Sequence, residues 1–164
     1  MKVEVLPNTL SFEGILDEQC VLDDLVGAFS KIQGTGFQEP LNLDLSQVRR
    51  ANSSGIIIWL KFLQKTGTQM CYINSPVWLV NQFNMIDQFF ENASKVKSVQ
   101  APYYCEDTGG SMNINLNIGE EIPIKESYED FALENKVIDG QEYEPDFEPE
   151  RYFSFLTGIQ ENYS

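Results

Sequence analysis

Two adjacent serines, Ser53 and Ser54, are the residues of this chain whose type and position suggest chemistry most directly. They follow Asn52 and precede Gly55, and the residues after Gly55 are apolar at the three- and four-residue spacing of an amphipathic helix. The start of a helix carries unpaired backbone N–H groups and a partial positive charge, so it stabilises a phosphate or a carboxylate. The pattern therefore predicts two hydroxyl groups at a position suited to anion binding or to phosphorylation.

The elements predicted on either side determine where these serines lie. Residues 41–45 alternate leucine with polar side chains, a period of two that is typical of a half-buried strand. The helix is expected to begin at Ser53 or Ser54 and to end at Gly67. One of the two serines is then expected to cap the helix, a contribution of about 1 kcal/mol to stability.

The segment Leu41–Val48 and the following Ser53-Ser54-Gly55 resemble the STAS domain. The signature of that family is a strand of the form L-x-L-D-L-S-x-V and a D-S-S-G or D-S-T-G sequence that opens a helix. The resemblance covers residues 1–100 and implies a mixed sheet with helices packed on one face. STAS domains include the cytoplasmic tails of sulfate transporters and bacterial anti-sigma factor antagonists. In the antagonists a partner kinase phosphorylates the serine after the aspartate, which corresponds to Ser53, and Asn52 stands in place of that aspartate.

Charged residues near the serines have two interpretations each. Arg49 and Arg50 are predicted to lie in the loop before the helix, where they either bind an acidic partner or a nucleotide or are simply solvated. Asp44 is expected near the end of the strand, and a loop-ordering acceptor is favoured over a metal or partner site. Ser53 is the candidate phosphoacceptor. The candidate partner-binding or anion-binding loop comprises Arg49, Arg50, Asn52, Ser53, Ser54 and Gly55.

A second resemblance concerns the C-terminal part of the chain. Residues 102–108 and 145–156 are similar to the ends of a zinc-ribbon extension that follows some STAS-like domains, in which C-x-x-C occurs twice. Here Thr108 stands three residues after Cys105, and no cysteine follows. A structural zinc site needs four ligands, and the chain contains no histidine. We therefore expect a degenerate zinc ribbon with no metal, and no cofactor elsewhere.

Composition limits the classes of partner. The formal net charge of −14 argues against nucleic acids and anionic membranes, because both are bound through Lys and Arg. The sequence has no apolar run near 18 residues and no signal-like N-terminus. Its three cysteines are far apart and do not form a disulfide framework. These features predict a cytoplasmic protein whose partners are other proteins, acting as a monomer or a homodimer.

Periodicity over residues 1–100 predicts the element order β-β-α-β-α-β-α-β, which belongs to the α/β class. A hairpin is expected across Pro7-Asn8, a first helix from Asp17 or Glu18 to Gly34, and a last strand over residues 95–99. A domain boundary is placed between residues 100 and 101, where the composition becomes strongly acidic.

Residues 101–164 are expected to form a small, acidic, β-rich extension. Residues 112–118 alternate apolar residues with asparagine, and residues 120–124 are their predicted partner strand. Two or three strands alone are marginal in water. The extension is therefore expected to pack on the first domain through residues that include Tyr103, Ile114, Leu116 and Phe131. The apolar C-terminal segment is also expected to be buried, through Tyr152, Phe153, Phe155 and Leu156.

The predicted function is non-enzymatic regulation by protein–protein contact through the serine loop. The resemblance implies an anti-sigma factor or a kinase-like ATPase as the partner. Nucleophilic catalysis has no support, because no histidine can act as a base and no glycine-rich phosphate loop occurs. Two alternatives remain: a module that binds a small anionic ligand at the same helix start, and a structural adaptor without a phosphorylation switch.

Overall fold

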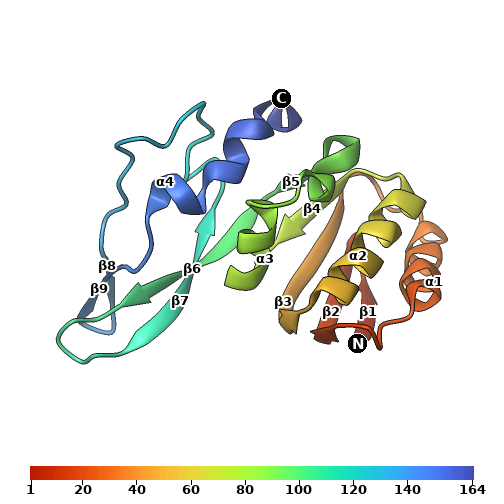
Figure 1. Ribbon diagram of the computed structural model, residues 1–164, viewed down its shortest axis with the longest axis horizontal. Coiled ribbons are helices and arrows are strands. Elements are labelled where there is room, and N and C mark those ends of the chain that lie inside the picture. The colour runs from red at the N-terminus through yellow and green to blue at the C-terminus, as the bar shows by residue number, and fades with distance from the viewer.

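The computed structural model describes residues 1–164, which form two sheets arranged end to end (Figure 1). The first sheet has five strands in the order β1-β2-β3-β4-β5. Its strands are β1 (Lys2–Leu6), β2 (Thr9–Leu16), β3 (Leu41–Ala51), β4 (Met70–Ile73) and β5 (Lys95–Val96). β1 and β2 form an antiparallel hairpin, and β2 to β5 are parallel neighbours. The chain thus belongs to the α/β class, as predicted, and β3 is an interior strand.

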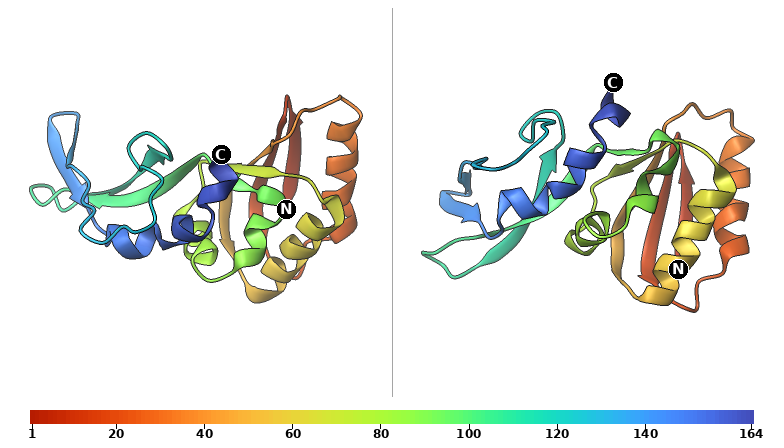
Figure 2. Two further views of the ribbon diagram at one scale, coloured as in Figure 1. Left: turned by 90° about the horizontal axis from the view of Figure 1, so that it is seen from above. Right: turned by 45° about the horizontal axis from the view of Figure 1, so that its top comes forward.

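Helices cover one face of this sheet. They are α1 (Leu22–Gln33), α2 (Ser53–Thr66), α3 (Val77–Phe83) and the 3₁₀ segment η1 (Asp87–Ala93). Leu10, Leu43 and Tyr72 are buried neighbours in register across β2, β3 and β4. The Trp59 indole of α2 donates a hydrogen bond to the Tyr72 hydroxyl at 3.2 Å. Figure 2 shows α1 and α2 on the same side of the strands, while the opposite face of β3 presents half-buried polar side chains.

The second sheet is antiparallel and has the order β7-β6-β9-β8. Its strands are β6 (Ser98–Tyr104), β7 (Ser111–Asn117), β8 (Lys136–Ile138) and β9 (Gln141–Pro145). The chain then forms α4 (Pro149–Tyr152), η2 (Ser154–Gly158) and η3 (Gln160–Tyr163). These short helices return toward the first sheet, where the Tyr163 hydroxyl donates to the Val96 carbonyl at 2.7 Å (Figure 1).

A single hydrophobic core of 35 buried residues joins both parts of the molecule. Tyr103 and Leu116 enter it from the second sheet, and Ile114 and Phe131 pack against it. Phe155 of η2 stacks on Phe90 of η1, with ring centres 5.7 Å apart. The extension is therefore packed on the first sheet, as the apolar C-terminal segment predicted.

The predicted start of the first helix is wrong. α1 begins at Leu22, because Asp17 closes a turn instead of starting a helix. The Asp17 carboxylate accepts a hydrogen bond from the Gln19 amide, and its carbonyl accepts one from the Cys20 amide, both at 3.0 Å.

The single strand predicted over residues 95–99 is also wrong, since the chain passes from one sheet to the other at Lys97. β5 ends at Val96, and β6 runs from Ser98 to Tyr104. The expected boundary between residues 100 and 101 therefore falls inside β6.

The strand pairing predicted within the extension is wrong as well. β7 pairs with β6 over seven residue pairs, and residues 120–124 contribute only an isolated bridge between Ile118 and Ile122. A turn in which the Gly119 amide donates to the Ile122 carbonyl takes their place, and Pro123 has no N–H to offer a ladder. None of the helices has the length and apolar character needed to cross a membrane.

Candidate functional site at the start of α2

Asn52 caps α2. Its backbone is extended, and its side-chain oxygen accepts a hydrogen bond from the Gly55 amide at 2.9 Å. The prediction that Ser53 or Ser54 caps the helix is wrong. Asn is as good a cap as Ser, and here it precedes both serines, so its oxygen reaches the amide of the third helical residue.

Because Asn52 is the cap, neither serine is needed to cap α2. Ser53 and Ser54 are the first two residues of α2, and both are exposed. Neither hydroxyl forms a hydrogen bond with another group of the protein. Both hydroxyls are therefore free to meet a kinase, a partner or water.

Gly55 brings the start of α2 against the end of β2. A Cβ atom added to Gly55 would lie 1.9 Å from the Leu16 carbonyl oxygen and 2.7 Å from the Asp17 nitrogen. The Asn52 amide donates to the same Leu16 carbonyl at 3.1 Å. Close packing of the two backbones therefore explains why residue 55 is a glycine. This packing does not explain the two serines before it.

Glu18 also belongs to the site, although no sequence pattern pointed to it. The Asn52 side-chain amide donates to the Glu18 carboxylate at 2.6 Å, and this hydrogen bond lowers the pKa of Glu18. The two residues are 34 positions apart. They meet because β2 and β3 are parallel neighbours that end together, with Leu16 opposite Ala51.

Arg49 and Arg50 lie in β3 and not in the predicted loop. β3 extends to Ala51, and Arg50 is paired in register with Ile15 of β2. The register shifts beside this pair, since Val48 is opposite Gly14 and Arg50 is opposite Ile15, so Arg49 is the extra residue of a β-bulge. Both arginines are exposed, and neither forms an ion pair with a carboxylate.

Exposed apolar side chains flank the serines at this edge of the sheet. Val21 immediately precedes α1, and Ile57 is in the first turns of α2; they are 52% and 53% exposed. Both helices follow parallel strands, so their starts lie at the same edge of the sheet. This edge therefore offers hydroxyls, an acidic group and two apolar side chains.

Asp44 lies in the middle of β3 and not near its end. Its carboxylate accepts hydrogen bonds from the Ser46 amide at 2.9 Å and from the Asn74 side chain at 3.3 Å. Asp44 therefore orders the turn after β4, in agreement with the predicted role of a hydrogen-bond acceptor that orders a loop.

Cys105 is buried in the turn between β6 and β7. Its thiol donates to the Gln141 side-chain oxygen across 3.8 Å, so the tips of two hairpins meet there. No group of three or more histidine, cysteine, aspartate or glutamate side chains in the protein is placed to hold a metal ion.

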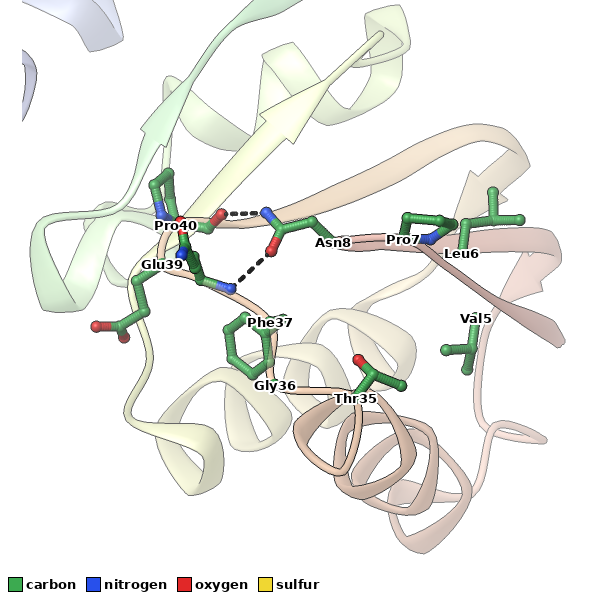
Figure 3. Close-up of a pocket in the computed structure, with 10 residues that line it drawn as sticks. Val5, Leu6, Pro7, Asn8, Thr35, Gly36, Phe37, Glu39 and Pro40 are labelled. Atoms are coloured by element: carbon green, nitrogen blue, oxygen red, sulfur yellow. Dashed lines mark hydrogen bonds between the residues drawn. The ribbon is translucent and has the colours of Figure 1, made fainter.

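A hollow of about 760 Å³ lies at the opposite edge of the first sheet (Figure 3). Its walls are the β1–β2 turn and the segment between α1 and β3. Asn8 joins these walls, because its amide donates to the Pro40 carbonyl at 3.0 Å and accepts from the Gln38 amide at 2.9 Å. Glu39 is the only charged residue of the lining, and its carboxylate accepts a hydrogen bond from the Gln69 amide at 3.0 Å.

Comparisons of this chain with protein-family models, with curated proteins and with solved structures give no significant match. The resemblance to STAS domains therefore rests on residues 41–48 and 53–55 and remains a prediction. The geometry itself establishes a helix start with an asparagine cap, two free serine hydroxyls and a glycine that the packing requires.

Proposed function

We propose that this protein is a non-enzymatic module for regulatory protein–protein contact, and that its contact surface is the edge of the sheet around the start of α2. The observation that carries this proposal is the freedom of the Ser53 and Ser54 hydroxyls. Because Asn52 provides the cap, helix stability gives no reason for either hydroxyl. The flanking Val21 and Ile57 add apolar area of the kind that a protein partner buries.

The site is also suited to a phosphorylation switch at Ser53. A phosphate would add a charge of about −1.5 to −2, and the first turn of a helix stabilises such a charge. The fold would therefore tolerate the modification. A partner whose matching surface is acidic or apolar would not, since docking would desolvate the new charge.

A protein partner fits this edge better than a small anion does. The exposed Val21 and Ile57 side chains offer apolar area that a protein partner would bury and that a small anion would leave uncovered. The resemblance to anti-sigma factor antagonists suggests an anti-sigma factor or a kinase-like ATPase as that partner.

Quantitative capture with the full-length chain tests the surface. Ser53→Asp should reduce retention of the partner at least tenfold, whereas Ser53→Ala should retain it. Ser111→Asp adds the same charge at an exposed serine of β7 and serves as the matched control. Melting curves of the three variants should coincide with that of the wild type. If Ser53→Asp binds the purified partner as the wild type does, the loop is only a helix start and the proposal fails.

Mass spectrometry of the protein isolated from its native cell tests the switch separately. Phosphate is expected on Ser53. A protein that is phosphorylated only elsewhere would remove the switch from the proposal.

A further inference from the structure

Residues 101–164 carry nearly all of the net negative charge of this protein. Residues 101–164 contain fifteen of the 25 acidic residues but only three of the 11 basic residues, a formal charge of −12. The structure contains one ion pair in all, between Arg151 and Glu148. The carboxylates of the extension therefore have almost no cationic partners within the protein.

Four of these carboxylates gather on one face of the β8–β9 hairpin. Glu142 and Glu144 of β9 line a small hollow together with Glu106 and Asp107 of the β6–β7 turn. Glu142 and Glu144 are two residues apart, so their side chains point to the same face of the strand.

Val137 and Tyr104 complete this face. Val137 is opposite Glu142 in register, and at 72% it is the most exposed large apolar residue of the protein. Tyr104 is opposite Glu144, and the hydrogen bond and negative charge of Glu144, with the charges of Glu106 and Asp146, raise the pKa of its hydroxyl. We call Tyr104, Glu106, Asp107, Val137, Glu142 and Glu144 the acidic face.

The acidic face borders an unpaired strand edge. β8 is the last strand of its sheet, and none of the backbone hydrogen bonds made outside the helices and strands involves residues 136–138. Figure 1 shows the hairpin at the end of the molecule far from the first sheet. An exposed edge offers N–H and C=O groups for pairing with another chain.

We infer that β8 and the acidic face bind an extended, Lys- or Arg-rich segment of a partner protein by strand addition. The backbone of that segment would pair with β8. Cationic side chains on the face of the segment that carries Val137 would reach the carboxylates of Glu142 and Glu144, because β9 is the strand next to β8. Charge complementarity favours a cationic segment over a second copy of this chain, because a second copy would bring the same negative charge to the contact.

This surface is separate from the serine loop, so it does not depend on the proposed function. It would give the protein a second contact surface.

The test uses the full chain and three synthetic eight-residue probes. One alternates lysine with valine, one alternates glutamate with valine, and one has the lysine sequence with every second backbone nitrogen methylated. Fluorescence anisotropy should detect binding of the first probe only. The methylated probe keeps the charge but loses the donors for strand pairing, so equal binding of both lysine probes would overturn strand addition.

Variants locate the binding. Glu142→Gln combined with Glu144→Gln should weaken binding of the lysine probe at least tenfold. The control is Glu4→Gln with Glu91→Gln, which makes the same change in charge at exposed residues of the first part of the chain. Equal losses in both double variants would show non-specific charge attraction and would refute the inference, as would the absence of binding to the wild type.

Discussion

At the scale of single residues, Gly55 has the most restricted environment in the candidate site. Gly55→Ala should lower the free energy of unfolding by about 3 kcal/mol or more, because the new methyl group would overlap the Leu16 carbonyl and the backbones must separate. Urea unfolding measures this change. Gly27→Ala, in the interior of α1 with no atom within 4 Å of the new methyl group, should instead stabilise by about 0.5–1 kcal/mol. A neutral Gly55→Ala variant would contradict the close packing.

Glu18 should make stability at this edge depend on pH. Its hydrogen bond with Asn52 lowers the pKa of the folded carboxyl below its ordinary value of 4.5. The resulting stabilisation is present above that ordinary value and is lost as the pH falls through the lowered one. Wild type should therefore be slightly more stable than Glu18→Gln at pH 7, and this difference in stability should be smaller at pH 3. Denaturant midpoints at the two pH values provide the comparison, and an equal difference at both would exclude this origin.

At the scale of elements, Asn84 joins the end of α3 to the C-terminal helices. Its side-chain oxygen accepts from the Phe155 amide at 2.8 Å and from the Ser154 hydroxyl at 2.9 Å. Its side-chain amide donates to the Tyr152 carbonyl at 3.1 Å. One asparagine therefore holds α4 and η2 against the first sheet.

Asn84→Ala should destabilise the protein by about 2 kcal/mol, since three hydrogen bonds of about 0.5–1.5 kcal/mol each are lost and their partners are partly buried. Asn81→Ala, an exposed position in the same helix, is the control and should change stability by less than about 0.5 kcal/mol. Hydrogen exchange should localise the effect of Asn84→Ala to residues 149–163. Uniform protection in that segment would argue that the aromatic contacts alone hold it.

At the scale of the whole molecule, the shared core predicts that both sheets unfold together. A chain ended after Gln100 would lose most of β6 and the residues that cover Val99, Phe83 and Phe90. The new apolar surface should bind a hydrophobic dye, promote association and lower the melting temperature. Calorimetry of the full chain should show a single transition. Two transitions, or a monomeric truncated chain that melts as the full chain does, would show that the two parts are independent.

The sequence alone determined the elements whose burial is local and periodic. The alternating leucines of β3 and the helical spacing in α2 were correctly interpreted, because each pattern reports which side of one element faces the core. The apolar residues near the C-terminus likewise predicted a packed extension. Apolar side chains tend to be buried, and this tendency can be used even when the surface on which they pack is unknown. The position of the serines at a helix start was also predictable.

Only the tertiary structure decided which groups meet. Asn52 and the two serines are all good caps, and the order of the residues at the end of β3 selected Asn52. Glu18 reached the site, and Gly55 became necessary, because β2 and β3 end side by side. Likewise β7 found its partner in β6 and not in residues 120–124. Every residue except proline has the same backbone N–H and C=O groups, so the local sequence pattern does not specify which strands pair. Strand pairing depends on how the whole chain packs.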